Sequence, residues 1–487
     1  MIPIVTPEEM AAIDAAAPEP VEVLIERAGS AVAWAARRMM GGTYARRVHL
    51  IAGKGNNGND GRVAARRLTQ WGVRVWCHDA ARLPAALAGA DLVIDAAYGT
   101  GFRGTWDAPD VGVTPVLAVD IPSGVDGLTG VVNGSALAAR RTVTFAALKP
   151  GLVLAPGRWL AGDVDVADIG LDVGASRTHL VTGEDVARWW PKRPPDAHTW
   201  RGAVRIVAGS PGMTGAAHLA ATAAQRAGAG MVTLSIPGHD GVAGPVEAVQ
   251  RAVPRSGWAE SVLADIERDH AAVVGPGLGR EEATVAAVRS FAAECPLPLV
   301  LDGDALFAVA WSEAGGAGWL RRRSAATVLT PHDGEFGLLA GARPGADRLL
   351  AARRLAADTR SVVVLKGPST VIADPAGDVR VVTVGDERLA TAGTGDVLAG
   401  MIGAVLAGGQ AVFDAAAAAA WVHGASAARG PAHGLVAGDV VAELPTLLDE
   451  LLAQTRSEDA SLRSSQPVAP RSGGEPDRAQ IVGEDRP

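Results

Sequence analysis

The part of the sequence best suited to chemistry is a glycine-rich turn ahead of an apolar helix. Gly393-Thr394-Gly395-Asp396 precedes residues 397–406, whose apolar positions have helical spacing. The glycines allow backbone conformations closed to other residues, so the turn can direct free N–H groups toward a phosphate. A carboxylate beside phosphate is unfavourable unless it removes a proton from the group that attacks phosphorus, which makes Asp396 a candidate base. The alternative is an Asp that only stabilises the first helical turn.

Length, charge and cysteine content restrict the class of protein. The 487 residues leave room for two or three domains. The formal net charge of −8 comes from 45 basic and 53 acidic residues, so we expect neither nucleic acid nor a membrane as partner. Cys77 and Cys295 are far apart in sequence and indicate no disulfide framework, which fits a reducing cytoplasm. We therefore expect a cytoplasmic protein that binds small molecules.

In the first third of the sequence, short apolar runs alternate with helix-length or glycine-rich segments, which favours a parallel sheet. Ligand sites in such sheets lie at the carboxyl ends of the strands. Glycine-rich loops follow the runs at residues 53–61, 99–104 and 121–127. Asp120 ends one predicted strand and is either a helix cap or a catalytic group. Lys149 follows another and is a phosphate ligand, a proton donor or a surface residue.

Taken together, these loops resemble the NAD(P)H-hydrate epimerase domain over most of residues 1–170. The residues that carry the resemblance are 53–61, Asp95 with 99–104, 119–124 and 145–151. The resemblance implies a Rossmann-like fold and a site for the hydrated nicotinamide ring. The implied substrate-binding residues are Asn56, Asn57, Gly58, Asn59, Asp60, Gly99, Thr100, Gly101, Phe102, Arg103, Gly104, Thr105 and Asp120.

The same resemblance implies a potassium ion held by Asn57, Asp95 and Ser123. All three are oxygen donors at predicted strand ends, and hard cations take oxygen ligands, although this pattern alone does not establish a cation site. Asn59 stands where the family usually has a second glycine; asparagine is the best-tolerated replacement if the position needs a positive φ. Asp120 is the candidate acid–base group for inversion at C6, and Lys149 is a second candidate.

A segment with three prolines and mixed charge breaks this rhythm and indicates a domain boundary. We expect a first domain at 1–175, a linker and the start of the second domain at 176–200, and the second domain at 201–454. Residues 455–487 have almost no apolar side chains and are predicted to be a disordered tail. Strands and helices alternate again in the second domain, so the fold class is α/β with two three-layer α/β/α domains.

Five glycine-rich or polar loops follow predicted strands of the second domain, at residues 275–279, 302–306, 330–335, 366–370 and 393–396. Their common position at strand ends indicates a nucleotide site. Within them a lysine could pair with phosphate and a histidine could meet a second substrate, although a lone histidine is more often structural. The sequence contains no Walker-type loop, which excludes a P-loop NTPase.

These five loops resemble the ADP-dependent NAD(P)H-hydrate dehydratase, which has a ribokinase-like fold, over roughly residues 198–445. The resemblance implies ADP as co-substrate and Mg²⁺ in this domain. The implied hydrate-binding residues are Ala216, Gly279, His332 and Asp396. The implied nucleotide-binding residues are Lys366, Gly367, Pro368, Ser369, Thr370 and Gly395.

Two adjacent domains that each resemble one step of a repair pathway support each other. The sequence therefore predicts a bifunctional enzyme that epimerises hydrated NADH and NADPH at C6 and dehydrates the S epimer with ADP, releasing AMP and phosphate. Two alternatives stay open. In one, the second domain is a conventional ribokinase-like kinase that phosphorylates a small alcohol; in the other, the first domain is a non-catalytic binding module. We also expect a homo-oligomer.

Overall fold

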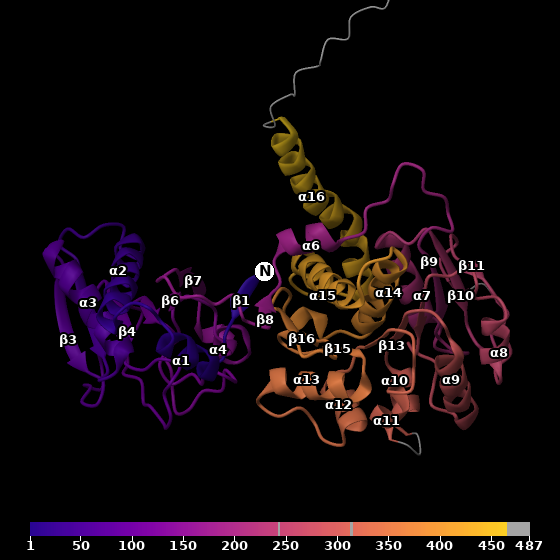
Figure 1. The fold of residues 1–487 in the computed structure, drawn as a ribbon, viewed down its shortest axis with the longest axis horizontal. Coiled ribbons are helices and arrows are strands. Elements are labelled where there is room, and N and C mark those ends of the chain that lie inside the picture. Colours follow the sequence, from indigo (N-terminus) through magenta and orange to yellow (C-terminus); the bar gives the residue numbers. More distant parts are fainter. Residues whose placement is uncertain (242–243, 312–314, 465–487) are drawn as a thin grey trace, which may run out of the picture.

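The computed structural model describes residues 1–241, 244–311 and 315–464, which form two α/β lobes side by side (Figure 1). In this part of the chain, no helix is long and apolar enough to cross a membrane. The first lobe contains one parallel sheet with the strand order β3-β2-β4-β5-β6-β7. Its strands are β2 (Arg47–Ala52), β3 (Arg74–Asp79), β4 (Leu92–Ala96), β5 (Val116–Val119), β6 (Arg141–Phe145) and β7 (Asp163–Ala167).

The first lobe also contains helices, of which the two longest pack on one face of this sheet. The helices are α1 (Pro7–Ala15), α2 (Val21–Met39), α3 (Asn56–Gln70), α4 (Pro150–Val153) and α5 (Gly157–Leu160). α2 and α3 bury their small and apolar residues against the strands. The other face packs against side chains of the connecting segments, among them Trp106 and Leu137. α1 begins with a capping box, in which Thr6 and Glu9 each accept the other's backbone N–H.

The second sheet has the strand order β1-β8-β17-β16-β15-β14-β13-β12-β9-β10-β11 within the described residues. From β15 to β11 all neighbours are parallel, whereas β16 runs antiparallel to β15 and β17. The strands are β1 (Ile2–Ile4), β8 (Thr178–Leu180), β9 (Ala203–Val207), β10 (Met231–Ser235), β11 (Val249–Gln250), β12 (Ala271–Val274), β13 (Leu299–Leu301), β14 (Thr327–Leu329), β15 (Val362–Leu365), β16 (Thr370–Ala373) and β17 (Val379–Val382).

Helices cover both faces of the second sheet, as a three-layer domain requires (Figure 1). One face carries α6 (Gly183–Trp189), α7 (Thr214–Arg226), α14 (Thr394–Ala407), α15 (Val412–Arg429) and α16 (Ala437–Ser464). The other carries α8 (Trp258–Leu263), α9 (Glu282–Glu294), α10 (Asp304–Ala310), α11 (Gly316–Leu320), α12 (Asp333–Ala340) and α13 (Arg348–Thr359). The α/β class and the two-sheet organisation predicted from the sequence are confirmed.

The two lobes are tied together at the predicted boundary. β1, at the start of the chain, pairs antiparallel with β8 and so joins the sheet of the second lobe. The N-terminal ammonium lies 2.7 Å from Asp185 Oδ1 in α6. Apolar residues of the first lobe, including Leu152 and Val153, share one core with Val371 and Val381 of the second. The segment 176–200 therefore contains structured parts of the second lobe, and a shared core opposes free movement between the lobes.

The C-terminal segment differs in part from the prediction. Residues 455–464, assigned from the sequence to a disordered tail, continue α16. A helix that has already formed gains further residues without a new nucleation step, so a polar segment can extend it. Residues 465–487 lie outside the described residues.

Candidate active sites

A cavity of about 770 Å³ opens at the carboxyl ends of the strands in the first lobe. This is where a parallel sheet is expected to bind its ligand. Most of the residues predicted for the hydrate site line it: Asn56, Asn57, Asp60, Gly99, Thr100, Gly101, Phe102, Arg103, Asp120 and Lys149. Gly58, Asn59, Gly104 and Thr105 are not among its lining residues.

The segment predicted as a loop at residues 56–60 is the beginning of α3, which follows Gly55. Two glycines allow strand and helix to meet closely there. A Cβ on Gly53 would lie 1.9 Å from Ala97 O, and one on Gly58 would lie 2.0 Å from Gly53 O. Gly58 therefore contributes to the site by allowing α3 to pack closely against Gly53, without lining the cavity. Asn59 is helical, so its substitution for glycine requires no unusual backbone conformation.

Asp120 is held in an uncommon backbone conformation directly after β5. Its φ is 67°, and Ala146, after the neighbouring β6, has a φ of 62°. Such angles are unfavourable for residues other than glycine and often mark functional sites. Asp120 Oδ1 lies 2.8 Å from Lys149 Nζ and accepts the Thr144 hydroxyl at 3.1 Å. The Thr100 N–H donates to Asp120 Oδ2 at 3.3 Å.

The ion pair between Asp120 and Lys149 determines the charge of the carboxyl group. Lys149 is only 1% exposed and also donates to Thr144 Oγ1 and Phe145 O. Burial raises the pKa of Asp120, but the Lys149 charge and the hydrogen bonds outweigh it, so the pKa lies below its ordinary value. Asp120 is therefore ionised at every physiological pH.

Asp60 behaves in the opposite way within the same cavity. Its burial, followed by the negative charges of Asp120 and Asp14, raises its pKa to about 8. At neutral pH Asp60 therefore keeps a proton that Asp120 has lost. A pair of carboxyl groups with separated pKa values is the usual sign of an acid and a base. Asp14, on α1, lines the cavity too and was missed in the sequence, where only the start of α1 is marked.

Of the three residues predicted to hold potassium, Asp95 and Ser123 are buried and contact each other. Asp95 is fully buried, accepts the Ser123 hydroxyl at 2.6 Å and the Ser123 N–H at 2.9 Å, and burial raises its pKa. Asn57 has both side-chain polar atoms buried without a hydrogen-bond partner. A buried amide oxygen without a partner fits a monovalent cation. Within the described residues no cluster of three or more His, Cys, Asp or Glu suits a metal ion.

In the second lobe, three adjacent parallel strands end in polar residues that contact one another. Asp302 follows β13, Thr330 follows β14 and Lys366 follows β15. Lys366 Nζ lies 3.0 Å from Asp302 Oδ1 and 3.6 Å from Glu335 Oε2, and the Thr330 hydroxyl donates to Asp302 Oδ1 at 2.5 Å. Burial lowers the pKa of Lys366, but the negative charges of its acidic neighbours raise it by more. The pKa therefore lies above its ordinary value, and the lysine is charged.

The Gly393–Asp396 turn meets these strand ends. Gly393 has a φ of 91° and caps α14, and a Cβ there would lie 2.5 Å from Leu219 Cδ1 on α7. A Cβ on Gly395 would lie 3.6 Å from Lys366 Nζ and 3.8 Å from Asp302 Oδ2. The positive φ and the close approach of Leu219 therefore require glycine at 393, whereas Gly395 brings the turn into ordinary contact with the lysine and the neighbouring carboxylate.

Asp396 stands in the first turn of α14, beside several charges. Its burial, followed by the negative charge of Asp302, raises its pKa to about 7; Lys366 opposes the shift and Asp304 adds to it. A general base works best when its pKa is close to the pH at which the enzyme operates. Asp396 is thus placed and poised to accept a proton.

The other predicted hydrate residues are distributed around this point. A Cβ on Gly277 would lie 2.8 Å from Ala216 Cβ, and the Gly279 N–H donates to Asp304 Oδ2 at 2.8 Å. His332 caps α12: its Nδ1 accepts two backbone N–H groups, and its side chain is 61% exposed. Its ring lies near Glu335, with Nε2 3.5 Å from Oε1. The histidine therefore has a structural task whether or not it binds substrate.

The predicted nucleotide loop, residues 366–370, faces the first lobe on one side. The Ser369 hydroxyl is buried and donates to Val153 O at 2.6 Å, and Pro368 O accepts from Arg158 at 2.7 Å. The hydroxyl of Ser369 thus binds the first lobe, and the side chains of Lys366 and Thr370 remain for a nucleotide.

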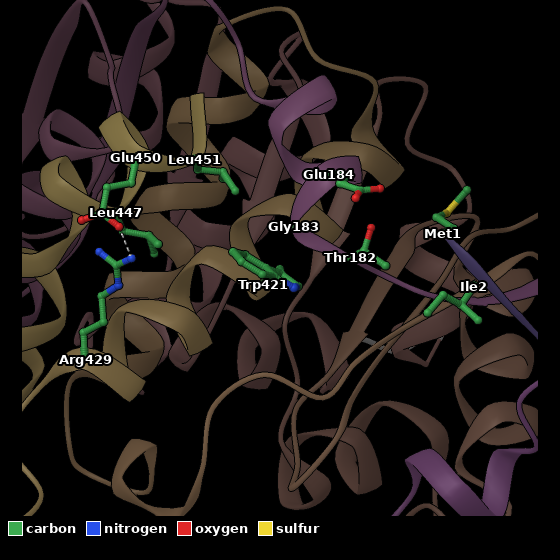
Figure 2. Close-up of a pocket in the computed structure, with 10 residues that line it drawn as sticks. All are labelled: Met1, Ile2, Thr182, Gly183, Glu184, Trp421, Arg429, Leu447, Glu450 and Leu451. Carbon is green, nitrogen blue, oxygen red and sulfur yellow. Dashed lines mark hydrogen bonds and ion pairs between the residues drawn. The ribbon is translucent and has the colours of Figure 1, made fainter. Parts of the chain in front are cut away.

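A second hollow, of about 510 Å³, lies where α6, α15 and α16 meet the start of the chain (Figure 2). Its floor includes Trp421 and Leu451, and an ion pair joins Arg429 to Glu450 at its side. Its lining, as far as the described residues go, contains none of the residues predicted from the sequence. It is separate from both carboxylate sites.

Comparison with known proteins assigns each half of the chain. Residues 204–446 match the family described as NAD(P)H-hydrate dehydratase, and residues 21–84 and 77–151 match the YjeF-related protein N-terminus. The bifunctional NAD(P)H-hydrate repair enzyme Nnr of Moorella thermoacetica is 35% identical over 522 aligned positions, covering 92% of this chain and 97% of that protein. The enzyme of the same name from Mycobacterium tuberculosis (strain H37Rv) is 39% identical over 370 positions, covering 70% and 74%.

Among solved structures, the ADP/ATP-dependent NAD(P)H-hydrate dehydratase from Bacillus subtilis, co-crystallised with ATP/Mg²⁺, is 30% identical. That similarity covers 56% of this chain and 98% of that chain, with a TM-score of 0.47.

The two sheets, each with a buried carboxylate site at its strand ends, are those of a two-domain α/β enzyme. With relatives matched over nearly its whole length, the chain belongs to the family of bifunctional NAD(P)H-hydrate repair enzymes. The resemblance inferred from the loop motifs is thereby confirmed.

Proposed function

We propose that this chain repairs hydrated NADH and NADPH. The first domain interconverts the R and S epimers at C6, and the second converts the S epimer to the reduced cofactor with ADP, releasing AMP and phosphate. The observation that carries the proposal is the presence of both sites in one chain that aligns with a bifunctional repair enzyme over 92% of its length.

In the second domain, hydroxide is a poor leaving group and has to be activated. Asp396 removes the proton from the C6 hydroxyl, and the oxygen attacks the β-phosphorus of ADP, which breaks the bond to AMP. The resulting phosphate then departs from C6 as the ring nitrogen shares its electron pair with that carbon, and loss of a proton from C5 to water restores the C5–C6 double bond of the reduced ring. Backbone N–H groups of Ala392 to Gly395 would stabilise the developing charge, and loss of one such donor typically costs about 3 kcal/mol of barrier.

Lys366 and Asp302 fit the charges of a bound nucleotide. Lys366 supplies positive charge next to Gly395, and Asp302 Oδ1 already accepts from Lys366 and Thr330. Magnesium bound to nucleotides usually takes only one or two protein carboxylates and keeps phosphate oxygens as its other ligands. Asp302 Oδ2 fits such a partly nucleotide-held Mg²⁺, whose charge would lower the repulsion between ADP and the incoming oxygen.

In the first domain, the two carboxyl groups have complementary protonation states. Inversion at C6 needs water to leave and to return on the other face of the ring. Asp60, protonated at neutral pH, would donate to the departing hydroxyl, and Asp120, ionised by Lys149, would take a proton from the returning water. Potassium held by Asn57, Asp95 and Ser123 would balance the buried Asp95 and fix the start of α3.

The test is an absorbance assay for reduced cofactor, with separated R and S hydrates, each with and without ADP and K⁺. The S hydrate should be restored with ADP alone, whereas the R hydrate should also need the first domain's activity. A small-alcohol kinase would restore no reduced cofactor from either epimer and would contradict the proposal. Analytical ultracentrifugation would test the expected homo-oligomer.

A further inference from the structure

The predicted nucleotide loop, residues 366–370, is held from two sides. Within the second lobe, Arg348 donates to Lys366 O at 2.8 Å and pairs with Asp333 at 2.9 Å. From the first lobe, Arg158 donates to Pro368 O at 2.7 Å. One of the two arginines that fix the loop backbone thus comes from the other domain.

Arg158 bridges the two strands of the β16–β17 hairpin at one end. Its Nη2 donates to Thr383 O at 2.5 Å, just beyond β17, while its Nη1 reaches Pro368 O, just before β16. The register pairs Thr370 with Val382, so these two carbonyl groups lie at the same end of the hairpin. Ser369 adds a second link, since its hydroxyl donates to Val153 O at 2.6 Å.

The position of Arg158 is itself fixed by close packing. α5 begins at Gly157, where a Cβ would lie 2.4 Å from Gly151 O and 2.6 Å from Val125 Cγ1. Val153 and Val371 belong to the core that the two lobes share. The arginine is therefore presented by a rigid part of the first lobe.

We propose that the first domain completes the nucleotide site of the second, with Arg158 as a positioning residue. By holding Pro368 O and Thr383 O, Arg158 keeps residues 366–370 in the conformation that presents the backbone of Gly367 and Ser369 and the side chain of Lys366 to ADP. The inference rests on the proposed function and extends it, because it makes ADP affinity in one domain depend on a side chain of the other.

Arg177 provides a matched control at the opposite end of the same hairpin. It donates to Ala376 O at 2.5 Å and pairs with Asp378 at 2.8 Å. Arg177→Ala removes a charge and a carbonyl contact from the β16–β17 hairpin, as Arg158→Ala does, but leaves residues 366–370 untouched. The two variants separate an effect on the loop from a general effect on the hairpin.

The experiment compares full-length wild type, Arg158→Ala, Arg158→Lys and Arg177→Ala. We expect Arg158→Ala to raise the KM for ADP and the calorimetric Kd for ADP about tenfold, as for loss of a charged hydrogen bond, with kcat and epimerase activity near wild type. Arg158→Lys should fall between, because lysine keeps the charge without the two-armed geometry. Arg177→Ala should bind ADP as wild type does.

Wild-type ADP affinity in Arg158→Ala, or an equal loss in Arg177→Ala, would overturn the inference. So would a fall in kcat with KM unchanged. If Arg158→Ala loses epimerase activity and so is misfolded, Arg158→Gln takes its place and is judged by the same affinities. Failure of the proposed function would instead appear as no reduced cofactor from the wild type, and the calorimetric Kd for ADP would still decide the role of Arg158.

Discussion

Each of the two sites contains a lysine near a strand end, buried in the first and partly exposed in the second, but the lysine pairs with a different kind of carboxylate in each. In the first domain Lys149 lies 2.8 Å from Asp120, the candidate catalytic group itself. In the second, Lys366 lies 3.0 Å from Asp302 and 3.6 Å from Glu335, so Asp396 receives only part of its charge.

This difference in lysine position gives Asp120 and Asp396 pKa values that are shifted in opposite directions. Burial acts on both carboxyl groups, but the direct ion pair lowers the pKa of Asp120, whereas neighbouring negative charge raises that of Asp396 to about 7. Asp120 therefore has a fixed charge, and Asp396 can exchange its proton near neutral pH. In this molecule, the position of the lysine decides which carboxylate can act as a base with a neutral pKa.

The largest effect should come from Asp396→Asn. An amide cannot take up the proton, so dehydration of the S hydrate should fall roughly a thousandfold, within the range for loss of a general base. ADP binding and epimerase activity should stay near wild type, since the substitution keeps the shape of the turn. The measurement is turnover of pure S hydrate with ADP. Near-normal turnover would show that Asp396 is not the base.

A second large effect is expected from Asp120→Asn. Conversion of the R epimer should fall roughly a hundredfold for want of the base. The change also leaves Lys149 buried without its counter-charge, so thermal unfolding should reveal a loss of about 3 kcal/mol.

Adding Lys149→Met to this variant distinguishes the two roles. The double variant should recover stability, because it removes the unpaired charge, but it should not recover epimerase activity. Recovery of activity together with stability would show that Asp120 serves only to neutralise the lysine.

The sequence revealed most of the strands because buried parallel strands are short, mostly apolar runs, as in β4 (Leu92–Ala96) and β12 (Ala271–Val274). It also revealed which strand ends carry polar groups. It could not reveal how those groups pair, because contacts such as Lys366 with Asp302 or Arg158 with Pro368 join residues far apart in the chain.

Two residues illustrate that limit in opposite ways. Asp14 lies on a helix whose capping box is clear in the sequence, yet nothing local shows that its side chain lines the cavity beside Asp120 and Asp60. His332 looks like a substrate ligand in the sequence, yet the structure engages its ring in capping α12. The first outcome depends on packing between segments, which local patterns do not encode. The second is local, because the ring accepts the N–H groups of Gly334 and Glu335, but histidine is not among the usual N-cap residues.

The pH dependence of the two activities should run in opposite directions. Because the base form of Asp396 is lost below its pKa of about 7, kcat/KM for dehydration should fall about tenfold per pH unit below that value. Epimerase kcat/KM should be flat through neutrality and fall above pH 8, where Asp60, with a pKa of about 8, loses its proton. Parallel profiles would contradict the assignment of acid and base.

Asp60→Asn sharpens this contrast through stability as well as rate. Because the pKa of Asp60 is raised in the folded state, its contribution to the free energy of unfolding is present at low pH and is lost as the pH rises toward 8. The variant lacks the acid, so its epimerase rate should be low at every pH, without the high-pH fall, and this loss of stability should disappear. If the free energy of unfolding of Asp60→Asn depended on pH as that of the wild type does, the group that titrates near pH 8 would not be Asp60.

The smallest effect should come from removing potassium, and it should be confined to the first domain. Asn57 has no partner for its buried amide, so K⁺ should raise epimerase activity several-fold and raise the melting temperature, because a ligand that binds only the folded state stabilises it. Dehydration of the S hydrate should be unchanged in sodium, because Lys366 already supplies the positive charge at the second site. Asn57→Ala should abolish the potassium effect on melting. If Asn57→Ala keeps the potassium effect, the cation binds elsewhere. The two sites would then differ in the position of the lysine, but a potassium site in the first domain would not be part of that difference.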